Sequence, residues 1–221
     1  MGVGKMINIL FEDNHLLVVE KPINIPVCED ESKDEDLLNM LKKYLKEKYN
    51  KPGNVYLGLV HRLDRPVGGV MVFARTSKAA SRLSDQVRTH ELKKTYHAIV
   101  LGNVENKGTF KDKLLKDSKT NITRVDKNGK ESILEYDLVK YKDNLSLVKI
   151  NLRTGRSHQI RVQFSSRNHP LYGDQKYNSK ARVGEQIALF ASSITFTHPV
   201  TKEVMTFSLD LPSRYPWEIF K

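Results

Sequence analysis

The sequence predicts an α+β fold, in which helices and loops flank a central mixed, mostly antiparallel β-sheet. Two segments carry a helical period of apolar residues, and most of the remaining chain consists of short alternating or β-branched segments typical of strands. No repeat, low-complexity tract or linker divides the 221 residues. A single domain spanning residues 1–221 is therefore expected.

The two helices are predicted from their periodicity and their ends. In residues 34–48 five apolar side chains recur at helical spacing, acids open the segment, lysines close it, and the sequence "NKPG" stops it. In residues 77–90 the apolar stripe is narrower, and Thr76 or Ser77 is the expected N-cap.

Nine segments are predicted to be strands: residues 16–19, 56–60, 70–74, 95–101, 133–141, 145–152, 160–164, 188–196 and 204–209. Asp143 and Asn144 separate two of them and predict a hairpin turn. Residues 102–130, rich in Lys, Asp, Asn and Gly, are expected to form short strands with exposed loops.

The composition narrows the partners and the compartment. A net charge of +11 favours a polyanionic partner such as nucleic acid, although a lysine-rich surface that only improves solubility explains it equally well. The single cysteine, Cys28, excludes an intramolecular disulfide and favours the cytoplasm. No apolar run is long enough to span a bilayer, and the first residues do not resemble a secretory signal, so no membrane association is expected.

No metal or cofactor is expected. The seven histidines are scattered without a ligand pattern, and neither a dinucleotide-binding nor a phosphate-binding glycine motif is present.

Asp64 is the first candidate for chemistry. It follows a predicted strand and lies between Arg62 and Arg65, which favour its ionised form. Such a carboxylate can act as a nucleophile or stabilise a cationic transition state. A salt-bridged turn without any function is the alternative, and the segment alone favours that alternative.

A second polar cluster lies in residues 152–164. If a strand begins near His158, one of its faces is polar and its other face is apolar; the polar face would carry Gln159, Arg161 and Gln163, and the apolar face Ile160, Val162 and Phe164. The polar face predicts a contact with phosphates or an active site, and a solvated edge strand is the alternative.

Six motifs occur in one order along almost the whole chain: "VVEKP" (18–22), "HRLD" (61–64), "KKTYHAIV" (93–100), "GRSHQIRV" (155–162), "HPLYGDQKY" (169–177) and "LFASSITFTHPVTKE" (189–203). In this series they resemble the RluA-type RNA pseudouridine synthases. The resemblance implies a pseudouridine-synthase-like catalytic domain that converts uridine to pseudouridine in transfer or ribosomal RNA. Transfer RNA is slightly preferred at this stage.

The resemblance also assigns residue roles. Asp64 is the essential aspartate, Tyr96 the active-site tyrosine, and Arg161 the arginine that pairs with Asp64. Arg62 would occupy the space that the extruded base vacates, and Ile160 would form an apolar wall of the uracil pocket.

Elementary chemistry agrees with these roles. Breaking a glycosidic bond develops positive charge on the sugar, which an ionised carboxylate can trap or stabilise. Attack of Asp64 on the sugar, attack on the ring, and removal of a sugar proton all remain open. Tyr96 can stack on the uracil and assist proton removal from C5, or it can be an ordinary half-buried strand tyrosine.

A uridine within folded RNA must be flipped out to react, so RNA contacts are expected around the site. The candidates are Arg62, Arg65, Arg153, Arg156 and the lysine-rich segment 107–130. Many relatives carry a small N-terminal RNA-binding domain. None is expected here, so the catalytic domain would recognise RNA unaided, as a monomer.

The sequence departs from the family pattern in two places. Residues 65–69 read Arg-Pro-Val-Gly-Gly where hydroxyl residues are common, so hydrogen bonds from such hydroxyls are not expected in that loop. Asn24 stands where a glycine is usual; asparagine tolerates a left-handed backbone, so the turn is expected to survive.

Two rival functions remain. One is a catalytically inactive RNA-binding protein on the same fold, which would not require Asp64, Tyr96 and Arg161 together. The other is an RNA-independent hydrolase that uses Asp64, which no other motif supports.

Overall fold

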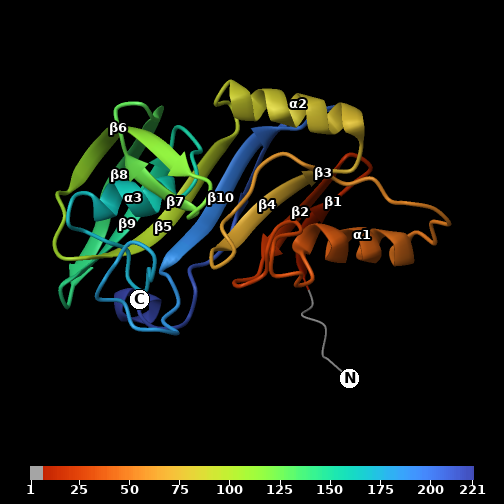
Figure 1. Cartoon of the computed structure of the whole chain (residues 1–221). Helices are drawn as coiled ribbons and strands as arrows, with labels where there is room; N and C mark the ends of the chain where they lie inside the picture. Colours follow the sequence, from red (N-terminus) through yellow and green to blue (C-terminus); the bar gives the residue numbers. More distant parts are fainter. Residues whose placement is uncertain (1–6) are drawn as a thin grey trace. The chain divides into compact units, whose positions relative to one another are not determined.

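The computed structural model describes residues 7–221, which form two compact units. Unit 1 contains the described residues through Leu92 together with Ser193–Leu209, and unit 2 contains Lys93–Ser192 together with Asp210–Lys221. Figure 1 follows the chain from its first described residue to its C-terminus. Within residues 7–221, no helix has both the length and the apolar character that a membrane crossing requires. The single domain expected from the sequence stays a prediction.

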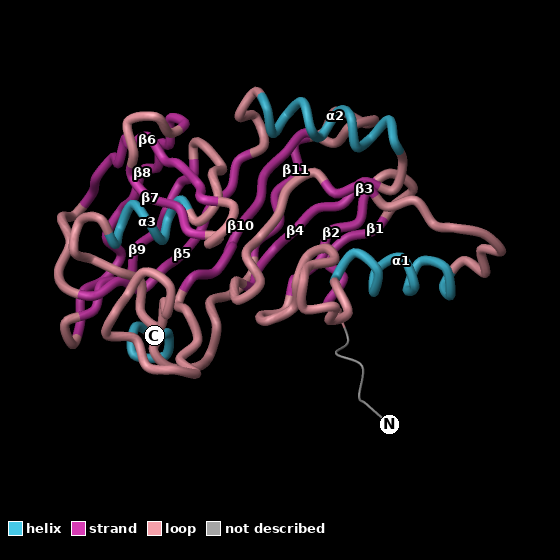
Figure 2. The backbone as a smooth tube through the Cα atoms, in the orientation of Figure 1, coloured by secondary structure: helices cyan, strands magenta, loops and turns pink. Residues whose placement is uncertain are grey.

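Unit 1 contains two helices and a set of antiparallel strands. Its elements are β1 (Asn8–Glu12), β2 (Leu16–Lys21), α1 (Leu37–Lys48), β3 (Gly58–Leu59), β4 (Gly68–Ala74), α2 (Ser77–Arg88), part of β10 (Leu189–Thr197) and β11 (Val204–Ser208). The strand order is β1-β2-β4-β10, with β3 beside β4 and β11 beside β10 (Figure 2).

The core of unit 1 follows from the alternation of side chains along β2 and β4. Val18 and Val72 are paired across the two strands and belong to one buried cluster with Ala79 and Leu83 of α2. Burying such aliphatic side chains contributes roughly 1.5–3 kcal/mol each. Figure 1 shows α2 on one side of these strands and α1 on the other. The expected N-cap is confirmed, because the Thr76 side chain accepts a hydrogen bond from the amide of residue 79.

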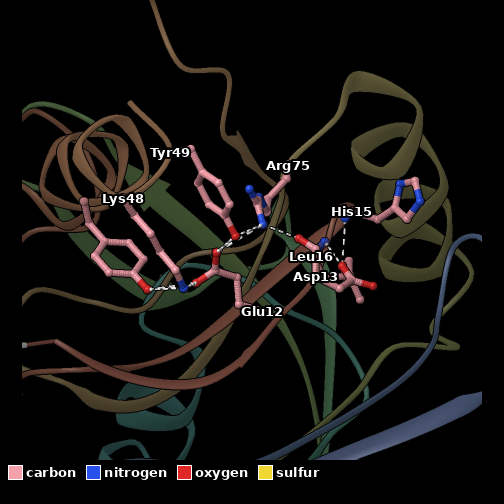
Figure 3. Close-up of polar contacts among 8 residues, drawn as sticks. Glu12, Asp13, His15, Leu16, Lys48, Tyr49 and Arg75 are labelled. Atoms are coloured by element: carbon pink, nitrogen blue, oxygen red, sulfur yellow. Dashed lines mark hydrogen bonds and ion pairs between the residues drawn. The ribbon is translucent and has the colours of Figure 1, made fainter. Parts of the chain in front are cut away.

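A network of polar groups surrounds Glu12 at the end of β1 (Figure 3). Its carboxylate accepts hydrogen bonds from Tyr44 and Lys48, both at 2.8 Å, and from Tyr49 at 2.5 Å. Arg75, which follows β4, lies 3.2 Å from the same carboxylate. Burial alone would raise the pKa of Glu12, but the hydrogen bonds outweigh burial and lower that pKa below its ordinary value. The network therefore fastens α1 and the end of β4 to β1.

Unit 2 is dominated by antiparallel strands. Its elements are β5 (Lys93–Leu101), β6 (Lys107–Asp117), β7 (Ile122–Val125), β8 (Lys130–Lys142), β9 (Leu145–Leu152), α3 (Gln159–Ser165), the first part of β10, and a 3-10 helix, Trp217–Phe220. The strand order is β10-β5-β9-β8-β6-β7. The hairpin predicted between β8 and β9 is confirmed: Asp143 and Asn144 both have positive φ, as a two-residue hairpin turn requires.

Aromatic rings join α3 to the sheet of unit 2. The ring of Phe164 lies 5.0 Å from that of Phe110 on β6 and 5.3 Å from that of Tyr136 on β8. Such edge-to-face and tilted pairs add to the free energy gained by burial. One end of α3 is thereby fixed on the β6–β8 face.

The α+β fold class is confirmed, but the strand predicted at residues 160–164 is wrong. That segment lies in α3, so Gln159, Arg161 and Gln163 do not share the face of a strand. The residues from Gln159 to Phe164 are all buried, so the alternation of polar and apolar side chains that predicted a strand does not mark one wet and one dry face. Instead, Gln159 and Gln163 lie one turn apart and are joined by a 3.1 Å hydrogen bond.

The remaining strand predictions agree with the structure to different extents. Of residues 56–60 only Gly58–Leu59 form a strand. Within 102–130, β6 is longer than the short strands expected, at 11 residues. The strand β1 was not predicted. The predictions at 16–19, 70–74, 95–101, 133–141, 145–152, 188–196 and 204–209 are confirmed, with only small differences at their ends.

Candidate active site

Asp64 lies in the segment that joins β3 to β4 in unit 1. We call residues 60–67 the Asp64 loop. Asp64 itself is half-buried, whereas its neighbours Leu63 and Val67 are buried and anchor the loop in the core. The amide of Val67 donates to the carbonyl of Asp64 at 2.9 Å, which closes a tight turn directly after the carboxylate. The short apolar run before Asp64 and the turn after it therefore set the position of its side chain.

Lys21 holds the backbone of this loop in place. Its side chain is 1% exposed, and its ammonium donates to the carbonyl oxygens of Pro22, Arg65 and Val67 at 2.9, 3.0 and 2.7 Å. A buried ammonium is costly unless its donors are satisfied, and three carbonyl acceptors satisfy them. One buried cation thus fixes the backbone on both sides of Pro66.

The departure from the family pattern at Asn24 has a structural answer. Asn24 has φ +63°, so the left-handed turn expected at that position is confirmed. Its amide donates to the carbonyl of Arg65 at 2.9 Å, which ties this turn to the Asp64 loop. On the other side of the loop, Gly69 has φ +128°, a conformation that side chains strongly disfavour.

The arginines that flank Asp64 point to different partners. Arg65 is exposed, and it forms an ion pair with Asp34 and a 2.8 Å hydrogen bond with Ser32, in the segment before α1. Arg62 is also exposed, with one guanidinium nitrogen 3.8 Å from the sulfur of Cys28. An exposed ion pair is weak and exchanges readily, so the pair of Arg65 is compatible with a later phosphate contact.

Tyr96 lies on β5 of unit 2 and is 6% exposed. It is paired with Ile150 on β9, and Lys94 and Ala98 share its face of the strand. The neighbours of Tyr96 in this register are therefore largely apolar, which suits a tyrosine whose ring contacts a base.

Arg161 is held by a buried carboxylate. The guanidinium donates from Nε and Nη2 to the two oxygens of Asp174, at 2.9 and 2.7 Å. Both side chains are nearly inaccessible, at 7% and 0% exposed. The Arg161 guanidinium also lies over the ring of Tyr177, 5.1 Å from its centroid. This bidentate pair fixes the plane of the guanidinium.

The partners of Arg161 are themselves fixed. Asp174 accepts hydrogen bonds from the amides of Lys176 and Tyr177, at 3.0 and 3.2 Å. The hydroxyl of Tyr177 lies 2.7 Å from Nδ1 of His158 and accepts from the amide of Thr123 at 2.8 Å. Burial raises the pKa of the Tyr177 hydroxyl, which keeps it protonated at neutral pH. We call Arg161, Asp174 and Tyr177 the Arg161 cluster.

The other predicted contacts of unit 2 lie near this cluster in the sequence. Ile160 is 5% exposed and precedes Arg161 on α3. Arg153 and Arg156 are exposed; Arg153 pairs with Glu135 at 2.8 Å, and Arg156 donates to the carbonyl of Glu131 at 3.0 Å. Neither arginine is buried, so both can reach solvent and any partner in it.

Each unit thus holds part of the predicted site. Unit 1 carries Asp64, and unit 2 carries Tyr96 and Arg161. The pairing of Arg161 with Asp64 stays a prediction. The pairing with Asp174 was not predicted, although a buried arginine requires a nearby acid and "HPLYGDQKY" contains one. Across residues 7–221, no group of three His, Cys, Asp or Glu side chains is arranged to hold a metal ion.

Comparisons with known proteins identify the family. A family model described as RNA pseudouridylate synthase matches residues 15–166. An uncharacterized RNA pseudouridine synthase, YhcT of Bacillus subtilis, is 34% identical over 212 residues, which cover 94% of this chain and 69% of the relative. Ribosomal large subunit pseudouridine synthase D of Zymomonas mobilis is 33% identical over 221 residues, with 93% and 69% covered.

Solved structures agree on the fold. Human RNA pseudouridylate synthase domain containing 4 superposes with a TM-score of 0.78 at 23% identity. The superposition covers 93% of this chain and 88% of the human chain. Human RNA pseudouridylate synthase domain containing 1 gives a TM-score of 0.74 at 21% identity, with 97% and 87% covered. Together with the motifs, these matches show that the chain belongs to the RluA-type RNA pseudouridine synthase family of isomerases.

Proposed function

We propose that this protein converts uridine to pseudouridine in ribosomal RNA, with Asp64, Tyr96 and Arg161 as its catalytic residues. The relative from Zymomonas mobilis, named as a large-subunit enzyme, supports ribosomal RNA over the transfer RNA first preferred. The net charge of +11 suits either RNA. A cytoplasmic monomer stays part of the proposal and rests on the sequence alone.

The reaction defines what the residues must do. The bond from C1′ to N1 of the uracil breaks, the uracil turns, and a bond from C1′ to C5 forms. The hydrogen at C5 leaves as a proton and N1 gains one, so substrate and product are isomers. Positive charge develops at the sugar as the bond from C1′ to N1 breaks, and ionised Asp64 stabilises or traps it. Attack on the sugar, attack on the ring and removal of a sugar proton all require the ionised form.

Tyr96 and Arg161 have complementary roles. The buried ring of Tyr96 stacks on the uracil and assists loss of the C5 proton. Arg161 is the proposed positively charged partner of Asp64 in the reaction. A guanidinium carries five N–H donors, and the pair with Asp174 uses Nε and Nη2. Ile160 on the same helix forms an apolar wall against the base.

The observation that carries this proposal is the way the Asp64 loop is built. Lys21 and Asn24 contact this loop at the backbone carbonyls of Arg65 and Val67, and these contacts do not depend on the charge of Asp64. An Asp64→Asn change should therefore leave the loop in place, which separates the catalytic role from the structural one.

The proposed RNA surface consists of exposed arginines and lysines. Arg62 enters the space left by the flipped base, and Arg65, Arg153 and Arg156 contact phosphates. Lysines of segment 107–130 add to this surface. Some of their charge is balanced across the sheet, because Lys107 is paired with Asp137 and Lys113 with Glu131. The arginines are accordingly expected to contribute more than these two lysines.

The test is to map pseudouridines in cellular RNA with the gene deleted, and after complementation with wild type or Asp64→Asn. Loss of a site in ribosomal RNA that wild type restores and Asp64→Asn does not is the expected result. Loss of a site in transfer RNA instead would show that the substrate is transfer RNA, and the proposed mechanism would stand. Restoration by Asp64→Asn, or an unchanged map, would favour the inactive RNA-binding protein.

A further inference from the structure

Lys94 is a half-buried lysine near Tyr96 that the proposed mechanism does not use. It lies two residues before Tyr96 on β5, and both side chains project from the same face of the strand. Lys94 is paired with Leu152 on β9, directly before the loop of residues 153–158. Its ammonium reaches that loop: a Cβ placed on Gly155 would lie 3.1 Å from Lys94 Nζ. The charge therefore lies beside the backbone at Gly155.

The ammonium of Lys94 has no counter-charge in the described structure. Within residues 7–221, neither a hydrogen bond nor an ion pair to Lys94 Nζ is present, unlike Lys21, whose ammonium has three carbonyl acceptors. Burial lowers the pKa of Lys94 below its ordinary value, and no neighbouring group offsets that effect. A partly desolvated cation without a partner loses free energy that an anion would restore.

The surroundings of Lys94 favour an anion from solvent. The neighbouring loop carries Arg153 and Arg156, both exposed, so the local field attracts negative charge. Gly155 lacks a side chain, and so does not fill the space beside the ammonium. A lysine that only covers apolar surface usually extends its charge into water. The ammonium of Lys94 instead lies against the backbone of a loop.

We propose that Lys94 binds a phosphate of the RNA backbone next to the uridine that reacts, an inference that rests on the proposed function. Side chains two residues apart on one face of a strand are separated by about 7 Å. One nucleotide can bridge that separation, with its base on Tyr96 and a flanking phosphate on Lys94. The contact holds the flipped nucleotide by its backbone while Tyr96 holds its base, so Lys94 is a substrate-positioning residue.

Phosphate neutralisation tests this contact directly. The probe is a short single-stranded RNA with one central uridine among adenosines, compared with the same RNA carrying a neutral methylphosphonate on the 5′ or the 3′ side of the uridine. Affinity is measured for wild type, Lys94→Met and Lys94→Arg. For wild type, one of the two substitutions should weaken binding about tenfold, the value of one charge-assisted hydrogen bond. Lys94→Met should lose that sensitivity, and Lys94→Arg should keep it.

Lys93→Met is the matched control. Lys93 is exposed and precedes Lys94 on β5, so its side chain projects from the opposite face. This variant should respond to the methylphosphonates as wild type does. Methionine has a similar length to lysine and is apolar, so Lys94→Met is expected to fold, and its unfolding temperature checks this. An equal response of wild type and Lys94→Met would overturn the phosphate contact.

A second readout separates this inference from the proposed function. Pseudouridine formation in total cellular RNA is measured for the same variants. If wild type forms pseudouridine but shows no coupling between Lys94 and either phosphate, the inference on Lys94 is wrong and the proposed function stands. If the coupling is present and no pseudouridine forms, Lys94 still binds phosphate and the proposed function is wrong.

Discussion

The Asp64 loop and the Arg161 cluster hold their proposed catalytic residues in opposite ways. In the Asp64 loop, one buried cation holds the backbone carbonyls of Arg65 and Val67. In the Arg161 cluster, a buried carboxylate holds the guanidinium itself. The first arrangement tolerates a neutral substitution of the functional residue, whereas the second depends on charge balance. The two regions should therefore respond differently to loss of a supporting residue.

The largest effect on stability is expected from breaking the Arg161–Asp174 pair. Asp174→Asn removes a buried carboxylate from beside a guanidinium that is 7% exposed, and this should lower the free energy of unfolding by about 3–5 kcal/mol. Urea unfolding measures the loss. The control is Asp85→Asn, because the pair of Asp85 with Arg88 is largely exposed and should cost less than about 1 kcal/mol. Equal losses for the two variants would contradict the importance of burial here.

Lys21→Met should lower the free energy of unfolding less than Asp174→Asn does. It should also lower the turnover of the enzyme. The carbonyls of Pro22 and Val67 lose a charged donor, at an expected cost of about 2–4 kcal/mol. Because the backbone around Asp64 is released, turnover should fall more than RNA affinity, and the amide of Val67 should exchange its hydrogen faster.

Lys43→Met, on the exposed side of α1, is the control for Lys21→Met. It should change neither turnover nor the exchange of the Val67 amide. If Lys21→Met leaves the exchange of that amide unchanged, the loop is held by something other than Lys21.

The smallest effect concerns the Glu12 network, which supports unit 1 away from Asp64. The folded pKa of Glu12 is lowered, so its contribution is fully present above the ordinary glutamate pKa of about 4.3 and is lost as the pH falls through the lower folded value. Glu12→Gln should cost about 1–2 kcal/mol at neutral pH, because Arg75 keeps its hydrogen bond to the carbonyl of Asp13 and Lys48 is half exposed, and it should flatten the acid limb of the stability curve. Unfolding followed from neutral to acid pH measures both.

The exposed Glu47→Gln, on α1, is the control for Glu12 and should leave the acid limb unchanged. An acid limb for Glu12→Gln as steep as that of wild type would show that the network does not supply this pH dependence.

Much of the fold could be predicted from the sequence because its signals are local. The period of α1, the Thr76 cap and the hairpin at residues 143–144 each depend on neighbouring residues. The helix α3 could not be predicted in this way. Its six buried residues include polar side chains that are paired inside the protein, so the helix shows no distinct apolar face in the sequence. Its conformation depends on packing against Phe110 and Tyr136, which are distant in the sequence.

The candidate site likewise contains residues that local motifs predict and residues that only the tertiary structure reveals. The motifs predict Asp64, Tyr96 and Arg161 as site residues, but they do not tell which acid is buried beside which base. The contact of Lys21 with Val67 joins residues 46 positions apart, and no local pattern encodes it. Likewise, the position of Lys94 beside Gly155 depends on the pairing of β5 with β9. Supporting residues are set by tertiary structure, so they were the part of the site that sequence patterns missed.

The central proposal is that Asp64 is required for the chemical step and not for the fold of its loop. The most direct measurement compares pseudouridine formation by purified wild type and Asp64→Asn on ribosomal RNA, together with their RNA affinities. The account predicts no detectable product for Asp64→Asn, with an affinity within about tenfold of wild type, a difference of about 1.4 kcal/mol. Product formed by Asp64→Asn at the wild-type rate would contradict it.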